Sequence, residues 1–152
     1  MHILWLERAI DTRLREKFFP NEKQSEALNY AVIHDGEVVR RTSLIEWHEG
    51  QPGLIPTAAR FHITPEPRLL VFCHVIETGQ AGKRFAGNLL FEVLNDGSAG
   101  PVMQVPLRYP LDSYFVATPR AGSPPSYTLD LLGTTRGDPL TIRYARLKVS
   151  PK

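Results

Sequence analysis

Tight-turn sequences recur along this chain at nearly even intervals, each between two short apolar runs. They are Asp35-Gly36, Thr64-Pro65-Glu66-Pro67 and Asn95-Asp96-Gly97, and their centres lie about 30 residues apart. Glycine, proline and asparagine favour tight turns, and a chain that repeats strand, turn and strand forms antiparallel sheet. Even spacing favours stacked or radial sheets over one irregular sandwich. We therefore predict an all-β fold.

The predicted strands fall into groups of three, four and three. They lie at residues 2–7, 28–34 and 37–47, then at 60–63, 68–76, 88–94 and 102–107, and finally at 113–117, 127–132 and 141–149. Four antiparallel strands in about 50 residues match the size of a propeller blade. We interpret the 152 residues as one all-β unit with propeller-like blades at 1–50, 58–108 and 111–150. A β-sandwich is the alternative fold.

Two connecting segments interrupt this pattern. Residues 8–26 are polar, with Ile10, Leu14 and Phe18 at a spacing of four, which predicts a short helix or an ordered loop. Residues 50–57 contain a proline and are predicted to form a loop.

Composition argues against several classes of partner. The chain has 18 basic and 16 acidic residues, a formal charge of +2, so no concentrated basic face for nucleic acid is expected. No apolar run approaches the roughly 20 residues of a membrane helix, so we expect no membrane insertion. Cys73, the only cysteine, lies in an apolar run and is predicted to be a buried hydrophobe. We expect no cofactor and no metal, because the histidines lack ligand spacing.

The two outer groups each have one strand fewer than the middle one. This predicts exposed strand edges and exposed apolar surface, and hence association. Either a longer chain supplies the missing blades, or the protein is a homo-oligomer. The apolar start of the chain meets charge at Glu7-Arg8, so no signal peptide is expected, and the location stays unassigned.

Two stretches resemble a known family. Residues 29–39, NYAVIHDGEVV, and residues 59–71, ARFHITPEPRLLV, resemble consecutive blades of the sialidase-like β-propellers with BNR repeats. The resemblance extends over residues 1–107. It implies a six-bladed propeller from a secreted or periplasmic parent, acting in glycan binding or sialidase-like glycoside hydrolysis.

In the catalytic members of that family, an arginine cluster holds a sugar carboxylate, a tyrosine with a supporting glutamate is the nucleophile, and an aspartate is the acid or base. Arginine suits this task because its planar guanidinium forms paired, charge-assisted hydrogen bonds with a carboxylate. By this resemblance Arg60 and Arg120 are the candidate ligand-binding arginines. Tyr109 and Tyr114 flank Pro110 and are predicted to be exposed for stacking on a sugar ring. No catalytic residue is assigned.

A non-catalytic structural or protein-interaction module is the alternative function. A carbohydrate site predicts that arginines, an acid and aromatics converge on one rim, whereas an interaction module predicts that they are dispersed or paired with one another. Two pairings are expected on structural grounds: His62 with a main-chain group, and Asp130 with Arg143 or Arg146.

Overall fold

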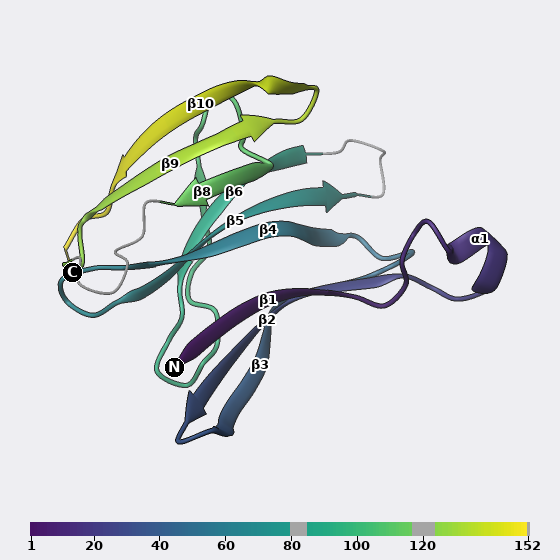
Figure 1. The fold of residues 1–152 in the computed structure, drawn as a ribbon, viewed down its shortest axis with the longest axis horizontal. Helices are drawn as coiled ribbons and strands as arrows, with labels where there is room; N and C mark the ends of the chain where they lie inside the picture. The colour runs from purple at the N-terminus through teal and green to yellow at the C-terminus, as the bar shows by residue number, and fades with distance from the viewer. Residues whose placement is uncertain (80–84, 117–123, 152) are drawn as a thin grey trace.

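The computed structural model of the protein describes residues 1–79, 85–116 and 124–151. These residues form three antiparallel sheets of three, four and three strands, as predicted, and they form no closed propeller (Figure 1). The strands are β1 (His2–Arg8), β2 (Ser25–His34), β3 (Glu37–His48), β4 (Gly53–Ile63), β5 (Leu69–Thr78), β6 (Phe85–Glu92), β7 (Met103–Val105), β8 (Ser113–Val116), β9 (Thr128–Thr135) and β10 (Asp138–Lys148).

Each sheet is built only from strands that follow one another in the sequence. The first sheet has the order β1-β2-β3, the central sheet β4-β5-β6-β7, and the last sheet β10-β9-β8. Figure 1 shows the central sheet lying between the other two. The backbone of β4 comes close to all three strands of the first sheet and to β8, so the sheets approach one another most closely along β4.

The predicted hairpin turn at Asp35-Gly36 joins β2 to β3. Both residues have positive φ, 49° and 83°, which is the backbone of the two-residue turn that matches the strand twist. A second tight turn at Arg136-Gly137 joins β9 to β10, with φ of 87° at the glycine. This turn was not predicted from the sequence.

The prediction of a loop over residues 50–57 is wrong in its second half, because β4 begins at Gly53. Proline usually argues against a strand, since it cannot donate to the ladder. Pro56 is tolerated because β4 lies at the edge of its sheet and the register with β5 shifts between Pro56 and Ala58.

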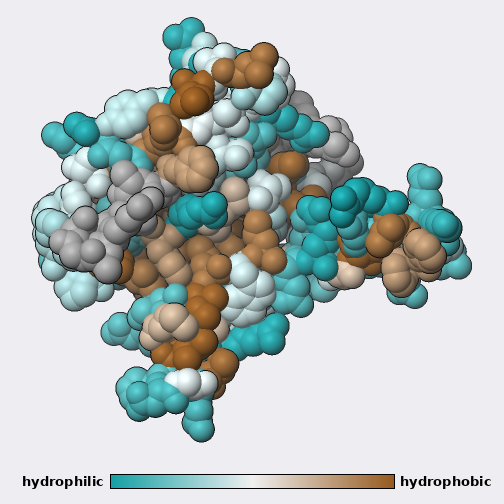
Figure 2. Space-filling view, in the orientation of Figure 1, coloured by the Kyte–Doolittle hydropathy of each residue, from teal (hydrophilic) through white to brown (hydrophobic). Residues whose placement is uncertain are grey.

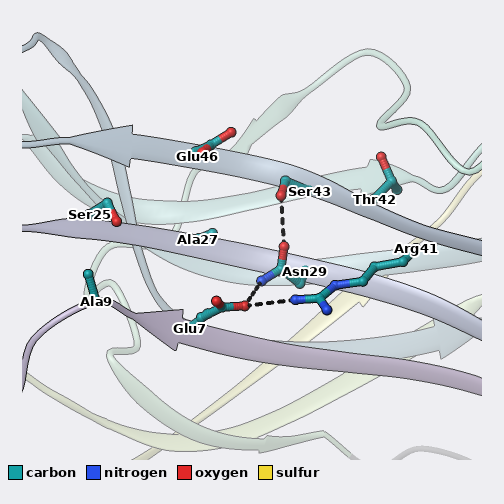
Figure 3. Close-up of a pocket in the computed structure, with 9 residues that line it drawn as sticks. All are labelled: Glu7, Ala9, Ser25, Ala27, Asn29, Arg41, Thr42, Ser43 and Glu46. Carbon is teal, nitrogen blue, oxygen red and sulfur yellow. Dashed lines mark hydrogen bonds and ion pairs between the residues drawn. The ribbon is translucent and has the colours of Figure 1, made fainter.

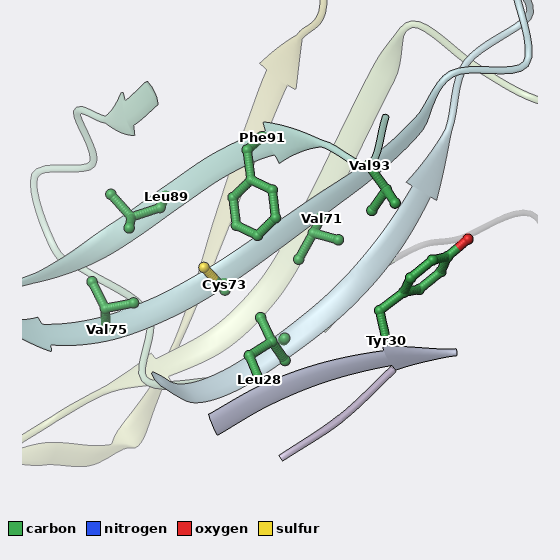
Figure 4. Close-up of a cluster of buried hydrophobic side chains, with 9 residues drawn as sticks. Leu28, Tyr30, Val71, Cys73, Val75, Leu89, Phe91 and Val93 are labelled. Carbon is green, nitrogen blue, oxygen red and sulfur yellow. The ribbon is translucent and has the colours of Figure 1, made fainter. Parts of the chain in front are cut away.

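The central sheet is buried on both faces, which explains the unbroken apolar run of β5. Alternate residues of a strand point to opposite faces. Val71, Cys73 and Val75 pack against Leu28 and Tyr30 of the first sheet (Figure 4). The predicted burial of Cys73 is thus confirmed.

The opposite face of the central sheet packs against the last sheet. Leu70 and Phe72 contact Leu129 and Leu131 in this second core. The segment before β8 is held by Asn88, whose side chain accepts from the main-chain N–H of Leu111 at 2.8 Å and donates to its carbonyl at 2.9 Å. This reciprocal pair closes the second core on one side.

An arm between β1 and β2 extends from the sheets and contains α1 (Arg15–Phe18), as predicted for residues 8–26 (Figure 1). The buried amide of Gln24 bonds both the N–H and the carbonyl of Ile10, at 3.0 and 2.7 Å. The arm exposes Leu14, Phe18 and Phe19, and Figure 2 shows hydrophobic atoms at its tip. No helix in the described part of the chain is long or apolar enough to cross a membrane.

Candidate functional site

The three described residues among the four proposed for ligand contact, Arg60, Tyr109 and Tyr114, do not form one site. Arg120 lies outside the described residues. Arg60 is exposed, and its guanidinium donates to the carbonyl of Ala59 at 2.7 Å. Tyr109 is 43% exposed, as predicted. The guanidinium of Arg143 lies 4.0 Å from the centre of its ring and covers one face.

The prediction that Tyr114 is exposed is wrong. The ring is buried between the central and last sheets, with its hydroxyl donating to the carbonyls of Ala58 and Phe72. Burial raises the pKa of this phenol, and the nearby positive charge of Arg60 lowers it by a smaller amount. The Tyr114 phenol is thus part of a sheet interface and is not exposed for stacking on a ligand.

The two predicted structural pairings are present. Nε2 of the buried His62 donates to the carbonyl of Ser126 at 2.8 Å. Asp130 pairs with Arg146 at 2.7 Å and also accepts from the Tyr144 hydroxyl at 2.6 Å. These two hydrogen bonds lower the pKa of the Asp130 carboxyl, with Arg146 contributing most.

The outer face of the last sheet exposes a row of large apolar side chains. Phe115, Leu132 and Tyr144 are direct partners across β8, β9 and β10, so their side chains lie side by side on one face. They are 74%, 47% and 59% exposed. Ile142, two residues before Tyr144 on β10, is also exposed, and Figure 2 shows hydrophobic atoms along this strand. We call Phe115, Leu132, Ile142 and Tyr144 the apolar row.

The outer face of the first sheet is more polar than the apolar row. Asn29 donates to Oε2 of Glu7 and accepts from Oγ of Ser43, both at 2.7 Å. Arg41 donates to the same Glu7 oxygen at 3.3 Å (Figure 3). Small side chains surround this network and leave a hollow of about 420 Å³, which we call the polar hollow; it is lined by Glu7, Ala9, Ser25, Ala27, Asn29, Arg41, Thr42, Ser43 and Glu46.

A cleft of about 600 Å³ lies between the first sheet and the central sheet. Nδ1 of His2 and the Tyr30 hydroxyl share a hydrogen bond of 2.7 Å in it, and the Arg40 guanidinium donates to the carbonyl of Asn95. Burial, and secondarily the N-terminal charge, lowers the pKa of His2, whereas burial raises that of Tyr30. Val32, Val39 and Leu69 supply apolar walls.

One pair has the composition of a nucleophile and a base. Oγ1 of Thr57 lies 2.6 Å from Nδ1 of the buried His74. The threonine hydroxyl also donates to the main-chain carbonyl of His74 at 3.3 Å. Among the described residues, no group of three histidine, cysteine or acidic side chains is placed to hold a metal ion.

Comparison of the chain with protein-family models, with curated proteins and with solved structures gave no match. The two outer sheet faces and the cleft are therefore the candidate sites of the described residues.

Proposed function

We propose that this protein is an interaction module that binds further β-sheet face to face, in the manner of propeller blades. The observation that carries the proposal is the apolar row. A row of large apolar side chains on one sheet face is the surface that sheet stacking normally covers, and exposed apolar patches of this kind mark interaction sites.

The chain's own central sheet supports the proposal. It is covered on both faces, by Leu28 and Tyr30 on one side and by Leu129 and Leu131 on the other. Each terminal sheet has only one covered face in the described residues. Each end of the three-sheet stack is therefore a sheet face that a further sheet can cover, as neighbouring blades cover one another in a propeller.

The pairing of the charged side chains also supports an interaction module. Asp130 is paired with Arg146, Glu92 with Arg68, and Asp138 with Arg143. A carbohydrate site of the sialidase type needs arginines and acids that converge on a ligand. These three acids are instead paired with arginines within the sheets.

Sedimentation of the full chain tests this proposal. We expect concentration-dependent association of the wild type, and we expect Leu132→Asp to reduce it while leaving the circular dichroism unchanged, because Leu132 is exposed. Val102→Asp is the matched control, since Val102 is 52% exposed in the segment before β7 and lies on neither outer face. A wild type that stays monomeric at high concentration would refute the proposal.

Sugar binding is a second proposed function, and the cleft supports it. Sugars bind where apolar walls accompany a few hydrogen-bonding groups, and the cleft combines Val39 and Leu69 with His2, Arg40 and Asn95. We expect Arg40→Ala to weaken binding of an acidic oligosaccharide by about 1.5 to 3 kcal/mol, the range for hydrogen bonds to charged groups. Arg13→Ala, on the arm, is the control. An oligosaccharide panel that shows no binding would refute this function.

A further inference from the structure

The apolar row and the polar hollow are complementary in size. The row carries Phe115, Leu132 and Tyr144, whereas the hollow lies over Ala27 and Asn29 of the central strand β2, with the larger Trp5 beside Asn29 at its border. Large side chains on one sheet face fit best against small ones on the other, because stacked sheets interdigitate.

The two faces are also complementary in charge. Glu7 and Glu46 lie on either side of Ala27 in the register of the first sheet, and with Arg41 they give the polar hollow a formal charge of −1 from two acids and one base. Beside the apolar row, Arg146 and Lys148 are exposed on β10, at alternate positions that continue from Tyr144. Asp130 offsets one of these charges, which leaves a formal charge of +1 from two bases and one acid.

The order of the three sheets within one chain indicates which face a further sheet would present to the last one. The first sheet covers one face of the central sheet, and the last sheet covers the other. If the stack continues in the same sense, the next layer beyond the last sheet meets it with the outer face of a first sheet. A second copy of the chain presents that face.

We propose that copies of this chain associate head to tail, with the apolar row of one copy seated over the polar hollow of the next. This inference rests on the proposed function and names its partner. A head-to-tail contact leaves one row and one hollow free at the ends of the assembly unless its rotation closes a ring, so further copies can add to it.

Two variants separate this arrangement from a symmetric one. Leu132→Asp places a charge within the apolar row. Ala27→Arg fills the polar hollow, and the monomer tolerates it because Glu7 and Glu46 are the cross-strand partners of residue 27. Both variants are compared with the wild type by sedimentation velocity, with circular dichroism and thermal unfolding to confirm folding, and with Val102→Asp as the control.

We expect the wild type to sediment at two or more times the chain mass and each variant alone to dissociate, with an apparent dissociation constant higher by at least about tenfold. An equimolar mixture of the two variants should regain association, because one intact row then meets one intact hollow. If the wild type associates but Ala27→Arg associates equally well, the head-to-tail inference is wrong and the proposed function stands. A monomeric wild type refutes both.

Discussion

The hydroxyl of Tyr114 lies 2.9 Å from the main-chain oxygen of Phe72, across the interface between the last sheet and the central sheet. The aromatic rings of these two residues also meet edge to face, with centroids 5.0 Å apart. Aromatic pairs prefer this geometry, and a buried phenol needs a hydrogen-bond partner. The pair thus joins two sheets through both its rings and its polar atoms.

Removing this hydroxyl should destabilise the stack. We expect Tyr114→Phe to lower the free energy of unfolding by about 1 to 2 kcal/mol, because the bonds of the buried hydroxyl to the carbonyls of Ala58 and Phe72 are lost without a cavity. Urea unfolding measures the change. Tyr144→Phe is the matched control, since its hydroxyl bonds Asp130 on an exposed surface, and it should change stability by less than about 0.5 kcal/mol. Equal losses in the two variants would contradict the interface role.

Gly133 is the position where the last sheet has no room for a side chain. A Cβ there would clash with the main-chain oxygen of Ser113 and lie 2.7 Å from Cβ of Tyr114. We expect Gly133→Ala to cost about 2 to 3 kcal/mol through overpacking. Gly137→Ala meets no atom within 4 Å but has a φ of 87°, so it should cost about 1 kcal/mol from backbone strain alone. Thermal unfolding of the two variants distinguishes steric exclusion from strain.

The base of the arm should open locally when Gln24 is changed to alanine. The variant leaves the N–H and carbonyl of Ile10 without their side-chain partner, which costs about 2 kcal/mol. Amide exchange in the arm should therefore accelerate by about thirtyfold, while β5 keeps its protection. Gln104→Ala, at an exposed position of β7, is the control. Unchanged exchange in the arm would show that other contacts hold it.

Acid should destabilise the protein through its buried histidines. Burial lowers the pKa of both His62 and His74 from 6.5, so the folded state binds fewer protons than the unfolded state. Their contribution to stability is complete above pH 6.5 and is lost as the pH falls toward their folded pKa values. Urea unfolding between neutral and mildly acidic pH should show this decline. His62→Gln should reduce this loss of stability at falling pH. Substitution of the exposed His34 should leave the loss unchanged.

Cys73 should report global unfolding. Its thiol is buried in the central strand β5, and desolvation raises its pKa to about 12. Thiolate is the reactive form, so a disulfide reagent should modify Cys73 only when the core opens. The modification rate should therefore rise with urea in step with the unfolded fraction. Rapid modification of the native protein would show instead that local opening around β5 exposes Cys73 without global unfolding.

The fold was largely predictable from local signals. The turn at Asp35-Gly36 depends only on the backbone preferences of two adjacent residues. The apolar run around Cys73 indicates a buried strand even when its partner strands are unknown. Pro56 misled the prediction, because its tolerance depends on β4 being an edge strand. That property belongs to the sheet order and cannot be found in the sequence near Pro56.

The candidate site was much less predictable. The exposure of Tyr114 was inferred from its place beside Pro110, but its burial depends on Phe72, which is 42 residues distant in the chain. The apolar row was missed because Phe115, Leu132 and Tyr144 come from three separate strands. They become neighbours only through the register of β8, β9 and β10.

Because each sheet contains only strands that are consecutive in the sequence, the chain passes from one sheet to the next only once at each interface. Residues 49–52 and 106–112 make these two passages. Cutting either passage would leave every ladder between paired strands intact. The resulting pieces would be held together by side-chain contacts and by a few hydrogen bonds such as that between Tyr114 and Phe72. The cohesion of such a nicked molecule would therefore measure directly how strongly two of these sheets adhere.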